Sequence, residues 1–254
     1  MLIDSHAHIR FEGRLDTQEI IKNMKSDGLE AIINVGTTLS DSRDAVRLAE
    51  ENDGVYAIVG LHPESVDEFS KEAINEIRDL AKSPKVVAIG EIGLDYHWNS
   101  KNKQEQKVMF ESLLEVAEEV GLPVCIHSRD AADDMFEILS KHASKLEKKG
   151  VLHCYGDGEK YAKAYTDLGY CISFAGNVTF KNYDRGFLKD LPRDQILVET
   201  DCPFLSPEPI RGRVNEPQNV KFTAEFLARE FGMEFEDFST LTVENTKRVY
   251  DKIK

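Results

Sequence analysis

Short apolar segments rich in β-branched residues alternate along this 254-residue chain with longer segments of helical periodicity. A strand followed by a helix, repeated in this way, is typical of parallel β/α units. Each apolar segment is continuous rather than alternating, which favours a sheet that is covered on both faces. The predicted strands are Leu2–Ile9, Ala31–Gly36, Val55–Leu61, Val86–Leu94, Pro123–His127, Val151–Tyr155, Tyr170–Phe174 and Ile196–Thr200.

Amphipathic segments between these strands predict the helices of the same units. They are Thr17–Asp27, Ser42–Glu51, Lys71–Lys82, Gln104–Val120, Ala132–Lys148, Glu159–Leu168 and, shorter, Asp184–Leu191. A proline-rich loop, Pro203–Pro217, follows the eighth strand, and helical periodicity then continues to Lys254. The chain contains no low-complexity linker that would separate domains, so we expect residues 1–254 to form one domain.

An open doubly wound sheet and a closed barrel both satisfy this alternation. A dinucleotide-binding sheet would carry G-x-G-x-x-G after its first strand, whereas here the first strand ends in His6-Ala7-His8. Polar residues instead follow many different strands, as they do in the active sites of barrel enzymes. The sequence therefore predicts a (β/α)₈ TIM barrel with a C-terminal helical extension.

His6 and His8 are the first candidates for chemistry. Residues at positions i and i+2 of a strand point to the same side, so both imidazoles can approach one metal ion. Taken alone, the pair fits exposed or hydrogen-bonded histidines equally well.

Other strand ends strengthen the metal hypothesis, because each carries a further potential ligand. These residues are Glu91, His127, His153 and Asp201. Burying such groups without partners would cost several kcal/mol each, whereas a metal cluster gives all of them partners.

The ligands divide into two predicted sites that share one carboxylate. The first site consists of His6, His8, Glu91 and Asp201, and the second of Glu91, His127 and His153. Glu91 is the predicted bridge, since a carboxylate can offer one oxygen to each ion. Mixed nitrogen and oxygen ligands suit two divalent ions among Zn, Mn, Fe and Ni, with Mg more loosely held.

Further residues near the same strand ends are candidates for substrate contact. His62 ends a strand in Gly60-Leu61-His62-Pro63 and is predicted to contact substrate or donate a proton, the alternative being a structural hydrogen bond. Tyr96 and Trp98 follow Glu91 in a loop over the same face and can stack a nucleobase, the alternative being simple packing.

Charge limits the class of partner. The chain has 32 Lys and Arg against 46 Asp and Glu, a formal net charge of −14. That excludes a broad basic face that binds nucleic acid, but two bound divalent ions would hold a phosphate locally.

No segment reaches the roughly 18 consecutive apolar residues of a membrane helix. The cysteines are widely spaced, without C-x-x-C pairs, and the cytoplasm is the expected compartment.

The motifs, taken in order, resemble those of the TatD-type metal-dependent deoxyribonucleases of the amidohydrolase superfamily. The matching segments are residues 3–8, 60–63, 90–96, 123–129, 153–155, 199–205, 211–217 and 244–246. The resemblance implies a (β/α)₈ barrel, a two-metal site on the ligands assigned above, and phosphodiester hydrolysis, often as a 3′→5′ exonuclease on DNA. The family usually has Phe-Ser-Gly after His-Cys, and this chain departs from it at Tyr155-Gly156-Asp157.

The mechanism expected from this resemblance uses a hydroxide held between the two ions. Asp201 accepts the proton of the attacking water, and His62 or a water on the metal protonates the leaving 3′-oxygen. Arg129, Arg211 and Arg213 are candidate phosphate clamps, the alternative being surface salt bridges. Glu199 is the predicted partner that orients a ligand histidine.

Two alternatives remain open at this point. The same site could hydrolyse another ester or amide bond, such as that of a D-aminoacyl-tRNA, because one fold hosts many chemistries. A metal-stabilised scaffold without enzymatic activity is weaker, since a structural site tends to be closed by protein ligands. DNA, either single-stranded or at its ends, is the expected partner.

Overall fold

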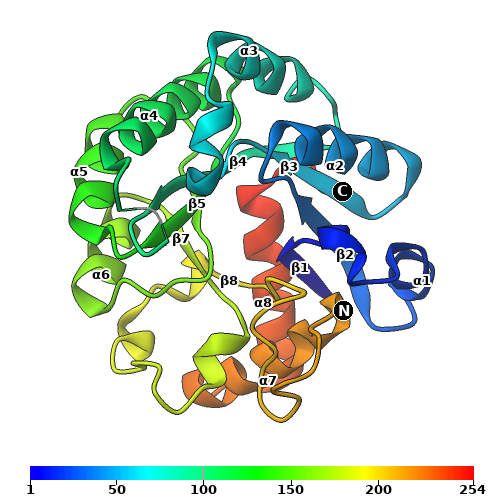
Figure 1. The fold of residues 1–254 in the computed structure, drawn as a ribbon. Coiled ribbons are helices and arrows are strands. Elements are labelled where there is room, and N and C mark those ends of the chain that lie inside the picture. The colour runs from blue at the N-terminus through cyan, green and yellow to red at the C-terminus, as the bar shows by residue number, and fades with distance from the viewer. Residues whose placement is uncertain (99) are drawn as a thin grey trace.

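Parallel strands form one sheet in sequence order (Figure 1). The computed structural model describes residues 1–98 and 100–254, without the side chain of Glu12. Every neighbouring pair of strands is parallel. The strands are β1 (Leu2–Ala7), β2 (Leu29–Val35), β3 (Val55–Val59), β4 (Val86–Asp95), β5 (Val124–Arg129), β6 (Gly150–Leu152), β7 (Cys171–Phe174) and β8 (Ile196–Val198).

The sheet curves until its last strand returns to its first. The Asp201 N–H donates a hydrogen bond of 3.0 Å to the His6 carbonyl, and the His8 N–H donates one of 2.9 Å to the Cys202 carbonyl. These bonds lie just beyond the paired part of β8 and bring the sheet into a nearly closed barrel. The predicted TIM-barrel fold is thereby confirmed.

Helices surround the strands, and Figure 1 shows α3 to α6 along the outside of the barrel. Polar caps start several of them: the side chains of Asp16, Thr38 and Ser70 accept hydrogen bonds from the first turns of α1, α2 and α3. The helices are α1 (Thr17–Asn23), α2 (Leu39–Glu51), α3 (Lys71–Leu80), α4 (Lys103–Val120), α5 (Ala132–His142), α6 (Glu159–Asp167), α7 (Val220–Phe231) and α8 (Phe235–Val249).

The crossover between β7 and β8 differs from the prediction. The expected helix Asp184–Leu191 is only a single 3₁₀ turn, Leu188–Asp190, in a segment that the structure describes throughout. The Asp184 carboxylate accepts the Gly186 N–H at 3.0 Å, which favours a turn, and glycine opposes helix formation in addition. Pro192 then ends the segment. The seventh β/α unit is therefore closed by turns.

One end of the barrel is sealed by the C-terminal extension. Tyr250 and Ile253, which follow α8, are buried among inward-facing apolar residues that include Ile3, Ile58 and Leu197. These contacts lie on the amino-end side of the strands, so the polar strand exits occupy the opposite, open end.

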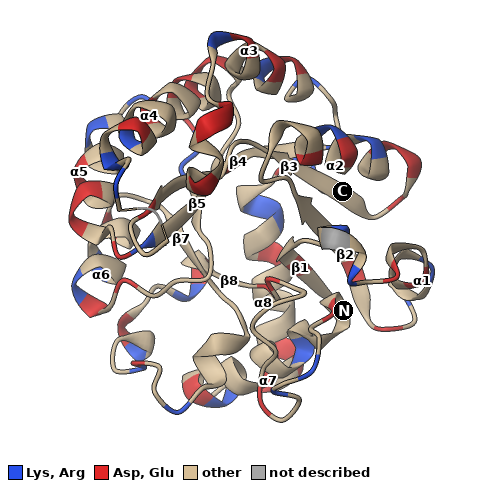
Figure 2. Ribbon diagram, in the orientation of Figure 1, with Lys and Arg blue, Asp and Glu red and all other residues tan. Residues whose placement is uncertain are grey.

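Charge is distributed over the outer helices, where Figure 2 shows acidic and basic residues intermixed. Among the described residues, no helix combines the length and the hydropathy needed to cross a bilayer. The cytoplasmic location stays a prediction.

Candidate metal centre

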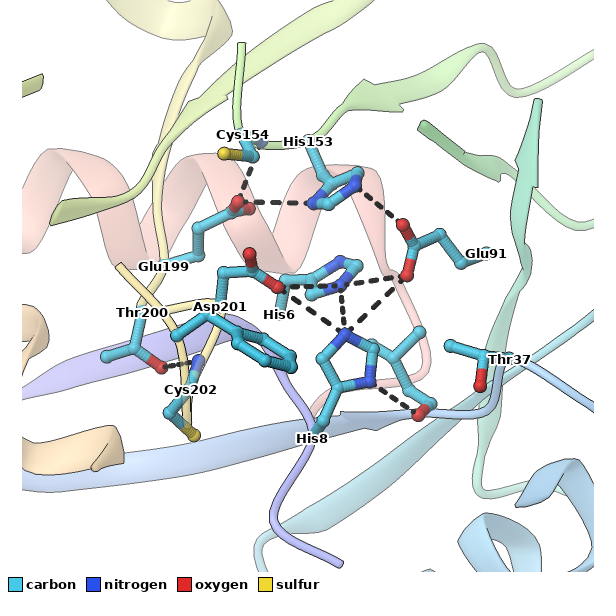
Figure 3. Close-up of polar contacts among 12 residues, drawn as sticks. His6, His8, Thr37, Glu91, His153, Cys154, Glu199, Thr200, Asp201 and Cys202 are labelled. Atoms are coloured by element: carbon cyan, nitrogen blue, oxygen red, sulfur yellow. Dashed lines mark hydrogen bonds and ion pairs between the residues drawn. The ribbon is translucent and has the colours of Figure 1, made fainter. Parts of the chain in front are cut away.

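The six predicted ligands meet at the open end of the barrel, and Figure 3 shows all of them except His127 converging, with Glu199 beside them. His6 belongs to β1 and His8 follows it, Glu91 lies within β4, and His127 lies within β5. His153 follows β6, and Asp201 lies three residues after β8. Since strand exits of a parallel barrel share one mouth, residues spread over most of the chain become neighbours.

The first ligand group consists of His6, His8, Glu91 and Asp201. The two histidine Nε2 atoms lie 3.1 Å apart, and Glu91 Oε2 lies 3.3 Å and 3.6 Å from them. Asp201 Oδ1 lies 3.8 Å from His6 Nε2 and 3.4 Å from His8 Nε2. Ligand atoms around a tetrahedral divalent ion with bonds of about 2.1 Å are about 3.4 Å apart, so this group fits one ion.

The second ligand group consists of Glu91, His127 and His153. Glu91 Oε1 lies 3.0 Å from His127 Nδ1 and 2.8 Å from His153 Nε2, and the two histidine nitrogens are 3.3 Å apart. Glu91 thus presents one oxygen to each group, the arrangement that a bridging carboxylate requires. His62 Nε2 stands 3.5 Å from Glu91 Oε1 and is a further potential ligand.

In each ligand histidine, the ring nitrogen that points away from the ligand group has a neighbour that helps to fix the orientation of the imidazole. In the first group, His8 Nδ1 donates to the Val35 carbonyl at 3.1 Å, which leaves Nε2 with a free lone pair. His6 Nδ1 lies 3.3 Å from Cys125 Sγ. In the second group, His127 Nε2 donates to Asp95 Oδ2 at 2.9 Å, so its Nδ1 is the metal-facing atom.

Glu199 lies against the far side of His153, where the sequence places the partner of a ligand histidine. Its Oε1 accepts the Cys154 N–H at 2.7 Å and lies 3.4 Å from His153 Nδ1. His153 Nδ1 and Glu199 Oε2 are both buried without a hydrogen-bond partner among the described residues. Such a pair of unsatisfied groups is expected where the ligand histidine moves slightly on binding an ion.

Burial and neighbouring charged groups shift the pKa values of the ligand side chains in opposite directions. Burial alone would raise the pKa of Glu91, but His153, His62 and His6 outweigh it and hold that pKa well below its usual value. Burial likewise opposes protonation of His8, yet its bond to Asp201 and the charge of Glu91 raise the pKa of His8 to about 9. Metal binding at His8 therefore displaces a proton over most of the physiological pH range.

His62 has the opposite electrostatic setting. Burial and the neighbouring His127 lower the pKa of His62 to about 3, so its ring is neutral at pH 7. Its Nδ1 accepts the Glu64 N–H at 3.2 Å, which leaves the single ring proton on Nε2, facing Glu91. His62 can therefore offer a hydrogen bond into the site, and it lines the cavity described below.

Asp95 is a functional residue that the sequence reasoning missed. Besides holding His127, its other carboxylate oxygen accepts the N–H groups of His97 at 2.9 Å and Trp98 at 3.0 Å. Burial would raise the pKa of Asp95, but the bond to His127 and these N–H groups lower it to about 2. Gln106 in α4 fixes its backbone through two bonds of 2.9 Å. The available signal was an aspartate at the exit of the long strand β4.

A glycine allows β4 and β5 to approach at this point. Gly93 has φ +145°, and a Cβ there would lie 2.0 Å from the His127 carbonyl oxygen. Asp95 and His127 can meet because this position carries no side chain.

An open cavity of about 1240 Å³ lies over the ligand groups. Trp98 and Arg129 line it as predicted; the indole is 64% exposed, and the guanidinium carbon lies 5.3 Å from its ring centroid. Tyr96 also lines the cavity but is buried, with its hydroxyl donating to Asp134 at 2.7 Å and Lys103 Nζ 4.0 Å from its ring centroid. Its burial and these contacts favour packing, the alternative role of Tyr96, over base stacking.

Arg211 and Arg213 lie apart from this cavity. Both are exposed and neither is among its described lining residues. The guanidinium carbon of Arg211 lies 3.9 Å from the Phe180 ring centroid. Of the three predicted arginine clamps, the structure places only Arg129 at the site.

Known proteins similar to this chain have the same size and fold. The sequence profile described as TatD related DNase matches residues 3–251. An uncharacterized metal-dependent hydrolase, YabD of Bacillus subtilis, is 40% identical over 98% of this chain and 99% of its own. The 3′-5′ ssDNA/RNA exonuclease TatD of Klebsiella pneumoniae is 31% identical over 92% of both chains. The crystal structure of YjjV, a TatD homologue of Escherichia coli, superposes with a TM-score of 0.92 at 26% identity, covering 98% of each chain.

Proposed function

This chain belongs to the family of TatD-related DNases and is a metal-dependent hydrolase, and we propose that it hydrolyses phosphodiester bonds in DNA. We propose more specifically a 3′→5′ exonuclease that acts on single strands or DNA ends with two divalent ions. The observation that carries the proposal is Glu91, which offers one oxygen to each of two ligand groups on the floor of an open cavity. The name of the Klebsiella pneumoniae relative supports the same substrate class.

Two divalent ions held by these residues would neutralise charge on the phosphate and lower the pKa of the attacking water. Asp201 accepts the proton of that water. Burial would raise its pKa, but the hydrogen bond to His8 and the nearby His6 lower it, so the carboxylate is ionised at neutral pH. Its side chain is mostly buried but lines the cavity, where it can reach a bound substrate.

His62 and Arg129 act on the other parts of the substrate. His62, neutral and protonated on Nε2, donates a hydrogen bond to the leaving 3′-oxygen. Arg129 holds a flanking phosphate from the cavity rim, with Trp98 stacking the adjacent base. Glu199 orients His153 from behind.

Hydrolysis by metal-depleted and metal-restored protein tests the proposal. Labelled single-stranded DNA, double-stranded DNA and RNA are incubated with Mg²⁺ or Mn²⁺ and with EDTA. We expect a ladder that shortens from the 3′ end and releases 5′-mononucleotides, with activity abolished by EDTA. Equal activity after exhaustive chelation would exclude the metal mechanism. Release of free amino acid from a charged tRNA, without cleavage of DNA, would favour a deacylase instead.

A further inference from the structure

Two phenylalanines line the cavity where the barrel closes on itself. Phe11 follows β1 and Phe204 follows β8, and their rings meet edge to face, with centroids 5.0 Å apart at 72°. The guanidinium carbon of Arg14 lies 5.5 Å from the Phe11 ring centroid. His8 connects this pair to the first ligand group, with its ring centroid 6.5 Å from that of Phe11.

The exposure of Phe204 requires an explanation. Folding buries most large aromatic side chains because apolar surface in water is costly, at roughly 25 cal/mol per Å². Within residues 1–98 and 100–254, the aromatic side chains that remain exposed are Trp98, at 64%, and Phe204, at 38%. Both line the same cavity. Two exposed aromatic rings that line one cavity indicate a binding role for that surface.

The two exposed aromatics lie on opposite sides of the ligand groups. Trp98 follows β4 and its neighbour Arg129 ends β5, whereas the phenylalanines follow β1 and β8. In a barrel with its strands in sequence order, the β4–β5 edge lies across the mouth from the β8–β1 edge (Figure 1). Glu91 and the histidines therefore lie between two aromatic surfaces, Trp98 with Arg129 on one side and the Phe11–Phe204 pair on the other.

We propose that Phe204, supported by Phe11 and Arg14, is a second base-stacking subsite, so that the enzyme holds a nucleobase on each side of the scissile phosphodiester. The inference deepens the proposed function and rests on it. An aromatic face stacks any base, because every base has a π-face. With Trp98 holding the base across the cleft, the phosphate that joins the two nucleosides lies over the ligand groups.

Dinucleotide substrates that lack one base test the proposal directly. KM is measured for wild type, Phe204→Ala and Trp98→Ala on a normal dinucleotide and on versions abasic at the 5′ or the 3′ nucleoside. Stacking energies predict that each variant raises KM by about 5- to 150-fold. In each variant, removing the base that the lost ring would have stacked should leave KM unchanged. If that base is the 5′ one for Phe204→Ala, it should be the 3′ one for Trp98→Ala, or the reverse.

Matched variants separate stacking from simple water exclusion. Phe204→Trp should keep the wild-type KM, whereas Phe204→Leu, which preserves apolar volume without an aromatic face, should resemble Phe204→Ala. Val214→Ala removes another exposed apolar side chain, one outside the described cavity lining, and should change nothing. A wild-type KM for Phe204→Leu, or a fall in kcat alone, would overturn the subsite.

Binding without turnover provides a readout that does not depend on hydrolysis. Trp98 is the single tryptophan of the sequence, so its fluorescence reports on one side of the cleft. In EDTA, a dinucleotide should quench Trp98 to the same final extent in wild type and Phe204→Ala, with Kd raised in the variant by the same factor as KM. DNA cleavage with unchanged Kd and KM would overturn the subsite alone. If no nucleic acid is cleaved with any metal, the proposed function fails, and a raised Kd still supports the subsite.

Discussion

The two ligand groups share Glu91 but are supported differently. In the first group, the histidines rest against neutral neighbours, the Cys125 thiol and the Val35 carbonyl. In the second group, His127 is bound by the carboxylate of Asp95, and His153 faces that of Glu199. A carboxylate behind an imidazole makes it a more basic ligand.

The groups also differ in the number of side chains they supply. Four side chains form the first group, whereas three form the second, where His127 is only part-buried at the cavity wall. An ion in the second group would keep more open positions toward the cavity. We infer that ligand number holds an ion in the first group and ligand basicity holds one in the second.

Glu91→Ala should have the largest effect because it removes a ligand from both groups at once. We expect kcat/KM to fall by at least about a thousandfold, since several kcal/mol of metal-dependent stabilisation would be lost. Metal content measured by mass spectrometry should fall in both sites. Asp133→Asn, which removes another charge from the cavity wall, is the matched control and should retain its metal. Full metal content in Glu91→Ala would contradict the shared-carboxylate arrangement.

His153→Ala separates the two groups. His153 is buried and stacked on His6, with ring centroids 3.9 Å apart, and its Nε2 lies 2.8 Å from Glu91 Oε1, the oxygen that faces the second group. We expect turnover to fall about a hundredfold and bound metal to fall toward one ion per chain. The melting temperature in EDTA should stay close to that of wild type, which separates loss of metal from loss of fold. Undiminished activity would show that the second group is not part of the active site.

The sequence allows the ligands to be predicted much better than the residues around them. His6, Glu91 and His127 are placed by a general rule, since the exits of parallel strands in a barrel share one mouth. Tyr96 and Arg211 lie in loops, whose side-chain directions depend on partners such as Asp134 and Phe180 that no periodicity reveals.

Asp95 shows the same limit within a strand. Its role depends on the register that pairs Gly93 with His127, and on the absence of a side chain at Gly93. The Asp184–Leu191 prediction failed because helical periodicity there competed with a local turn around Gly186. The strand register set the role of Asp95, and a local turn prevented the helix at Asp184–Leu191; the hydrophobic pattern of the sequence reveals neither.

Asp95→Asn tests whether ligand basicity supports the second ion. The variant removes the charge that makes the imidazole more basic, and its single amide oxygen cannot accept both the His127 N–H and the N–H groups of His97 and Trp98. We expect metal affinity to fall about 10- to 100-fold for the second ion only. Cys125→Ala is the matched change behind the first group, and we expect a smaller loss there, because a neutral thiol adds little basicity. Equal losses in the two variants, measured by titration calorimetry, would remove the distinction between the groups.

Competition between protons and metal changes affinity gradually with pH and acts on both groups, since the pKa values of His127 and His153 are raised as well as that of His8. Because the pKa of folded His8 is raised from 6.5 to about 9, its proton stabilises the metal-free protein fully below pH 6.5, and this contribution is lost as pH rises to 9. Metal needs the neutral ring, so its affinity should rise about tenfold per pH unit across the same window. Added Mn²⁺ should therefore raise the melting temperature by about 3–5 °C more at each higher pH unit. A gain in melting temperature that stays constant between pH 6.5 and 9 would mean that His8 does not bind the ion, and the first group would then consist of His6, Glu91 and Asp201 alone.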